Sequence, residues 1–143
     1  MERMTKQLAD TNRCGVYQLI RKPEEVERAA GNAGLTVFRI DIGDVKSKED
    51  FLARIAQELQ FPDWFGANWD ALNDCLTDLT KNGYVLIFEN CGSFAAGHKR
   101  EFERAIAVFV AAAEYWKTQG HPFWVLIEAS GKWGPSLPKW PDA

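Results

Sequence analysis

The chain has 143 residues, a formal net charge of -3 and a pI of about 5.4, and at this length we expect a single domain. With 46% hydrophobic and 13% aromatic residues, the chain can form a core without disulfides or metals, and disorder over most of its length is excluded. Direct binding of nucleic acid usually needs a basic stripe that neutralises phosphates. The acidic balance therefore favours a basic protein partner over nucleic acid itself.

The cysteines and the lack of long apolar runs argue against several further classes of protein. Cys14, Cys75 and Cys91 are an odd set without a CxxC pair, which argues against a disulfide framework and a zinc site. We therefore expect no metal and no other cofactor. The N-terminal segment MERMTKQLADTNR has no apolar signal-peptide core, and no run approaches the length of a membrane span. We expect a cytoplasmic protein without a membrane partner.

The first elements follow from local patterns. Residues 1–14 are polar, and we expect a flexible N-terminus there. Residues 15–20 indicate a short strand, and a helix is expected to begin at Pro23 and to end at Gly34. Residues 35–42 alternate between apolar and polar side chains, which predicts a second strand.

Two helices are expected next. Ser47 begins a capping-box-like sequence, and the helix that follows ends before Pro62. Asn68 is a suitable N-cap for the next helix, which is predicted to continue to about Thr80, with Gly83 closing the segment.

The remaining chain contains the most apolar strands. Residues 84–89 and 123–127 are nearly continuous apolar runs, typical of strands covered on both faces. Between them we expect a loop at 90–97 and a long helix that ends at Gly120. The proline-rich tail, 131–143, is expected to be irregular.

The alternation of strands and helices predicts an α/β fold, with a small parallel β-sheet and helices packed against it. We expect one domain over residues 15–130, between the flexible N-terminus and the Pro/Trp-rich tail.

The helix that starts after Asn68 has an acidic outer side. At about 100° per residue, its core side carries Trp69, Leu72, Leu76 and Leu79, and its outer side carries Asp70, Asn73, Asp74, Thr77, Asp78 and Lys81. Like charges at i,i+4 spacing cost a few tenths of a kcal/mol per pair, but they become favourable when a cationic partner arrives. A solvated acidic face is the structural alternative, because the helix dipole also favours an anion in the first turn.

The loop before this helix contains an aromatic pair. Trp64 and Phe65 lie between Pro62 and Gly66, where a short segment has little room to bury both. One exposed aromatic beside the acidic side would be a suitable interface hot spot. Burial of both rings in the core is the alternative.

At these residues the chain resembles the barstar-like family of intracellular ribonuclease inhibitors. The match is densest from Phe61 to Thr77, where a proline, an aromatic pair and a glycine precede the pattern Asn-x-Asp-Ala-Leu-x-Asp-Cys-Leu-Thr. Looser similarity covers residues 35–127. The resemblance implies a barstar-like fold with an extra N-terminal strand–helix unit. It also implies a non-enzymatic inhibitor that plugs the active site of a guanyl-specific, barnase-like ribonuclease and takes no small-molecule substrate.

The resemblance also implies roles for single residues. Asp74 is similar to the carboxylate that occupies the substrate-phosphate site, and Asp70 to one that pairs with an arginine on the guanine-recognition side. Trp64 stands where the family has a tyrosine that packs on the catalytic histidine. Gly66 and Asn68 match residues that hold the loop.

Other positions match in part or depart from the family pattern. Thr77 matches a residue at the edge of the contact, and Cys75 a cysteine that we interpret as packing. Asn73 replaces a tryptophan and Ala67 replaces a glutamate. Tyr115 stands where the family has a contact glutamate. These departures leave open a barstar-like module with a different basic partner and no inhibitory role.

Two further alternatives concern the same carboxylates. Asp70 and Asp74 resemble an acid–base pair, but a helix N-terminus and solvent exposure favour ionised carboxylates, which do not suit an acid catalyst. His98 and His121 have no Ser or Cys motif around them. A metal site on Asp70, Asp74 and Asp78 is disfavoured because one helix line spreads the ligands too far apart.

Overall fold

A computed structural model describes residues 2–62, 65–128 and 137–141. The elements, in chain order, are α1 (Glu2–Ala9), a 3-10 turn (Thr11–Arg13), β1 (Val16–Leu19), α2 (Pro23–Asn32), β2 (Thr36–Asp41), α3 (Lys48–Leu59), α4 (Trp69–Thr77), β3 (Tyr84–Glu89), α5 (Gly92–Gly97), α6 (Lys99–Thr118), β4 (Phe123–Ile127) and β5 (Lys139–Trp140).

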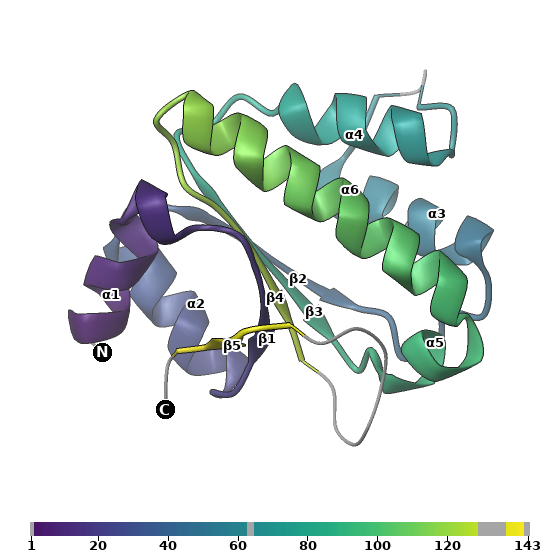
Figure 1. Cartoon of the computed structure of the whole chain (residues 1–143), viewed down its shortest axis with the longest axis horizontal. Coiled ribbons are helices and arrows are strands. Elements are labelled where there is room, and N and C mark those ends of the chain that lie inside the picture. Colours follow the sequence, from purple (N-terminus) through teal and green to yellow (C-terminus); the bar gives the residue numbers. More distant parts are fainter. Residues whose placement is uncertain (1, 63–64, 129–136, 142–143) are drawn as a thin grey trace.

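The strands form one parallel sheet in the order β2-β3-β4-β1-β5, so the predicted α/β fold is confirmed. The chain crosses from β1 to β2 in one direction and returns through β3 to β4 in the other. Because such crossovers are right-handed, the two directions place their helices on opposite faces. Figure 1 shows α1 and α2 on one side of the sheet and α3 to α6 on the other.

The continuous apolar runs are explained by these two covered faces. Alternate residues of β3 and β4 belong to two separate apolar clusters. Leu86 and Val125 pack on the side of α3 to α6. Val85 and Trp124 pack with α1 and α2 on the opposite side.

The N-terminal segment, which the sequence leads us to expect to be flexible, contains helix α1 at Glu2–Ala9. Among the polar residues of this segment is an i,i+4 apolar pair, Met4 and Leu8, and both side chains are buried against the sheet. The Trp124 indole N–H donates a hydrogen bond to the Leu8 carbonyl at 2.9 Å. A contact distant in sequence therefore fixes the end of this helix.

Two other segments are more regular than predicted. The expected loop at 90–97 contains the short helix α5, which buries Phe94. The tail was expected to be irregular, but Lys139–Trp140 form β5 in parallel pairing with β1. Trp140 is only 2% exposed, and Trp133 lies outside the described residues.

Within the part of the chain that the structure describes, no helix has the length and apolar character required to cross a membrane.

Candidate protein-binding site

Helix α4 begins at the N-cap predicted from the sequence. The Asn68 side-chain oxygen accepts a hydrogen bond from the Ala71 N–H at 2.8 Å, which satisfies one free donor of the first turn. The same side chain donates to the Gly66 carbonyl at 3.4 Å. Asn68 thus fixes both the start of α4 and the loop that leads into it.

The loop contains a residue in an unfavourable backbone conformation. Ala67 has φ 51°, in the left-handed region, where an L-residue with a Cβ pays roughly 1–2 kcal/mol. No feature of the sequence indicated this. Phe65 is half-buried and packs on Phe61 with ring centroids 5.2 Å apart. Trp64, the predicted aromatic contact, lies outside the described residues.

The inner side of α4 is fixed to the core as predicted. Leu72 and Leu76 are fully buried, and Trp69 is half-buried against the same cluster. Trp116 of α6 donates its indole N–H to the Leu76 carbonyl at 3.0 Å. The sequence placed Trp116 in the core but did not reveal this bond between the two helices.

Helix α4 is shorter than predicted, because it ends at Thr77 instead of about Thr80. The Leu76 carbonyl accepts a hydrogen bond from the Trp116 indole N–H. At the C-cap, the Asp78 N–H donates a hydrogen bond to the Cys75 carbonyl at 3.3 Å. Asp78 and Lys81 therefore lie beyond the helix. The predicted acidic row is reduced to two helical carboxylates, Asp70 and Asp74.

Both of these carboxylates are exposed to solvent. Asp70 lies in the first turn of α4 and Asp74 one turn later, so their side chains are neighbours on the same side of the helix. Among the residues described by the structure, neither carboxylate has a hydrogen-bond or ion-pair partner. The pair is thus available to a cationic partner on a rigid support.

The structure brings Tyr115 to the C-terminal end of this helix. Thr77 and Tyr115 line the same hollow of about 240 Å³, together with Lys81 and His121. Tyr115 is 44% exposed. The Thr77 hydroxyl donates to the Asn73 carbonyl at 2.9 Å, which leaves its lone pairs free to accept. Residues far apart in sequence thus form one continuous surface.

Asn73 and Cys75 are less accessible than the two carboxylates. Asn73 is half-buried, and Cys75 is only 3% exposed. Gly66, in the loop before the helix, is exposed. Burial raises the pKa of the Cys75 thiol, and the charges of Asp74 and Asp78 raise it further. The thiol therefore stays protonated at neutral pH and packs against the core.

Residues 2–62, 65–128 and 137–141 contain no group of three or more His, Cys, Asp or Glu side chains placed to hold a metal ion.

These features define an α/β protein with an exposed acidic helix, fixed at its N-cap and packed on a long helix. Residues 35–128, more than half of the chain, match the model of the Barstar (barnase inhibitor) family. The chain belongs to this family. A comparison with curated proteins finds no match.

Proposed function

We propose that this protein inhibits a basic, barnase-like ribonuclease by inserting the exposed side of α4 into its active site. The observation that supports the proposal most directly is the state of Asp70 and Asp74, which are exposed and have no partner in the described part of the chain. The family match over residues 35–128 includes this helix.

The physical basis is charge complementarity. A ribonuclease must stabilise a phosphate anion, so its active site holds fixed Arg, Lys and His groups. Two neighbouring carboxylates can take the place of two phosphate charges and accept bidentate hydrogen bonds from arginine. Because Asn68 and Trp116 already fix α4 at both ends, little conformational freedom is lost when the helix docks.

Substitution of Asp74 tests this function. In titrations against barnase activity, Asp74→Ala is expected to weaken inhibition by roughly 2–5 kcal/mol, because it leaves cations of the nuclease buried and unpaired. Glu2→Ala is the control, because it removes the same charge at an exposed position of α1, on the opposite side of the sheet, and it should change inhibition little. Equal, small effects of the two substitutions would contradict the proposal.

The surface beyond the carboxylates favours a second candidate, a different basic partner without inhibition of a nuclease. Tyr115 and the hollow beside Thr77 present an aromatic and polar surface where the family resemblance leads us to expect a glutamate. This candidate is supported if the protein leaves barnase active but captures from lysate a basic protein that Asp74→Ala no longer captures. Full inhibition of barnase would reject it.

A further inference from the structure

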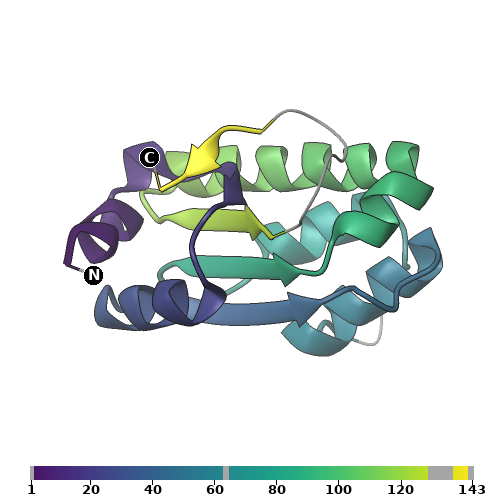
Figure 2. The ribbon, with the colours of Figure 1, turned by 90° about the horizontal axis from the view of Figure 1, so that it is seen from below.

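Strand β2 presents an open edge of the sheet. It is the first strand in the order β2-β3-β4-β1-β5, and Figure 2 shows it as the outermost strand along the lower border of the view. The Thr36 N–H donates to the Gly83 carbonyl and the Ile42 N–H to the Glu89 carbonyl, each at 3.0 Å. The even-numbered residues of β2 therefore bond to β3.

In a parallel ladder, alternate residues direct their backbone groups to opposite edges. Val37 and Arg39 thus direct their N–H and C=O groups away from β3. No strand in the described part of the chain pairs with this edge. The Asp41 carbonyl is already occupied, because it accepts a hydrogen bond from the Arg54 guanidinium.

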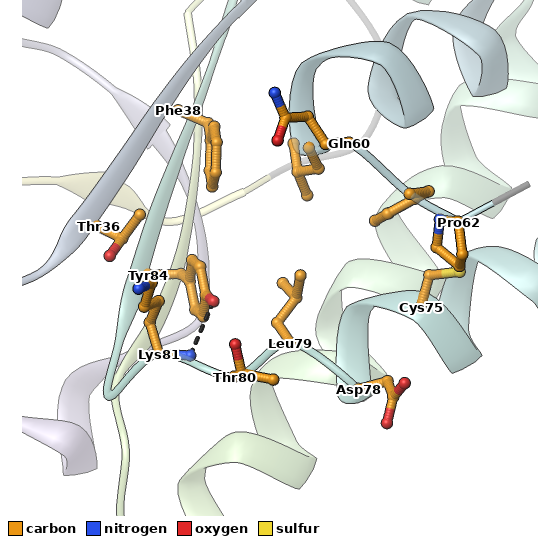
Figure 3. Close-up of a pocket in the computed structure, with 12 residues that line it drawn as sticks. Thr36, Phe38, Gln60, Pro62, Cys75, Asp78, Leu79, Thr80, Lys81 and Tyr84 are labelled. Atoms are coloured by element: carbon orange, nitrogen blue, oxygen red, sulfur yellow. Dashed lines mark hydrogen bonds between the residues drawn. The ribbon is translucent and has the colours of Figure 1, made fainter.

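On one face, the open edge borders an apolar hollow of about 360 Å³. Figure 3 shows Thr36 and Phe38 at its β2 wall, with the ends of α3 and α4 opposite. Phe38 stacks on Tyr84 with ring centroids 6.2 Å apart, and Leu79 lines the α4 side. The volume is at the lower end of the range for ligand pockets, about 300–1,000 Å³, and suits a few apolar side chains.

On the other face, the edge borders a cluster of acidic side chains. Arg39 pairs with Glu89 through two hydrogen bonds of 2.8 Å, and Glu24 and Glu27 of α2 share the same guanidinium at 3.4 Å. Lys22 is a further cation that acts on Glu24. The three carboxylates outnumber these two cations, and the side chains of Glu24 and Glu27 are more than half exposed.

We propose that β2 accepts an extended segment of a partner protein as an additional strand, in which apolar and basic residues alternate. Side chains of an added strand point to the same two faces as those of β2. Residues beside Phe38 would enter the hollow, and residues beside Arg39 would meet Glu24 and Glu27. This inference does not rest on the proposed inhibition of a ribonuclease.

The charge of the edge favours this partner over a second copy of the chain. Pairing of β2 with β2 of another molecule would bring two sets of Glu24 and Glu27 to one seam, where like charges repel. In an alternating segment, the basic residues would pair with these carboxylates and the apolar residues would fill the hollow.

The test uses the full chain and an end-blocked peptide of alternating lysine and leucine or phenylalanine. Its controls are the same residues in block order and a peptide with glutamate in place of lysine. The alternating basic peptide should bind with affinity in the micromolar to millimolar range and shift the NMR amide signals of Val37 and Arg39. Block-order and acidic peptides should bind at least about tenfold more weakly.

Two variants locate the binding. Val37→Pro removes an outward N–H without removing a bond to β3, and should weaken the basic peptide about tenfold or more. Glu27→Lys should weaken the basic peptide and strengthen the acidic one, whereas the exposed Glu103→Lys on α6 makes the same charge change and should alter neither. If Val37→Pro does not fold, the comparison of peptide binding by Glu27→Lys and Glu103→Lys tests the proposal instead.

Four results would overturn the proposal. The first is no binding of the basic peptide at millimolar concentration. The second is equal effects of Glu27→Lys and Glu103→Lys on binding. The third is a set of amide shifts confined to α4. The fourth is a dimer of the protein in sedimentation that Val37→Pro dissociates, which would assign the edge to a second copy.

Discussion

Asp41 connects three strand ends through its carboxylate. Its Oδ1 accepts hydrogen bonds from the Gly43 N–H at 2.9 Å and from the Asn90 side-chain amide at 3.1 Å. The Asn90 N–H in turn donates to Glu128 at 2.8 Å. These bonds, first that from Gly43 and then that from Asn90, hold the pKa of Asp41 below its usual value. One ionised side chain therefore helps to join the carboxyl ends of β2, β3 and β4.

The lowered pKa of Asp41 predicts a loss of stability in acid. A carboxyl group with a depressed folded-state pKa stabilises the protein above its unfolded pKa, about 3.9, and this contribution disappears as the pH falls through the folded-state pKa. Asp41→Asn should therefore lower the free energy of unfolding at pH 7 by less than about 1 kcal/mol, because the group is exposed.

Urea unfolding at pH 7 and near pH 3 measures this effect. The difference between wild type and Asp41→Asn should shrink at the lower pH, while the exposed Glu103→Gln stays close to wild type at both. A constant difference between wild type and Asp41→Asn at the two pH values would refute the role of this ionised group.

Some single residues of the candidate site were predictable and others were not. The caps at Ser47 and Asn68 involve bonds to residues three positions away, so local sequence reveals them. The left-handed Ala67 has no local sequence signal, and the early end of α4 coincides with a bond from Trp116, forty residues later in the chain. The burial of Cys75 follows from helical periodicity, because it lies beside Leu72 and Leu76.

Helix α4 depends on its N-cap for both stability and orientation. Asn68→Ala should destabilise the protein by about 1 kcal/mol, since it leaves the Ala71 N–H without its acceptor. Asn68→Ser keeps an accepting oxygen and should cost less. Thermal unfolding of both variants, with the exposed Asn82→Ala as control, measures the difference. The assignment fails if Asn68→Ala unfolds at the same temperature as the control.

The elements that sequence patterns predicted carry a local signal in the sequence. The strands β1 to β4 show alternating or continuous apolar residues, and the helices α2, α3, α4 and α6 show apolar residues at helical spacing. Helix α5 has six residues and β5 has two, so neither shows a period. Strand β5 exists through pairing with β1, more than a hundred residues earlier in the chain. The hollow beside β2 could not be predicted either, because four separate elements form it.

Different parts of the chain cover the two faces of the sheet. The family match, residues 35–128, contains β2 to β4 and the helices α3 to α6 on one face, including the proposed binding surface. The segments outside the match supply α1, α2, β1 and β5. Helices α1 and α2 cover the opposite face, where Val85, Ile87 and Trp124 are buried. The chain outside the family match therefore contributes mainly to the second core, on the face away from α4 (Figure 1).

Substitution of Trp140 tests whether the second core stabilises the fold without affecting the proposed binding surface. Trp140 packs on Trp124 with ring centroids 5.5 Å apart and is 2% exposed. Trp140→Ala should destabilise the protein by about 3–5 kcal/mol. The exposed neighbour Lys139→Ala should stay within about 0.5 kcal/mol of wild type.

Trp140→Phe should cost less than Trp140→Ala for two reasons. The phenyl ring keeps most of the apolar contact, and the Trp140 indole N–H has no hydrogen-bond partner within the described part of the chain, so its removal leaves no acceptor unpaired. Denaturant unfolding of the three variants gives the order of stability. Below the unfolding transition, the inhibition of barnase proposed above should be the same per folded molecule in the variants as in wild type, because α4 lies on the other face of the sheet. A Trp140→Ala protein that is fully folded yet binds more weakly would show that the two faces are coupled.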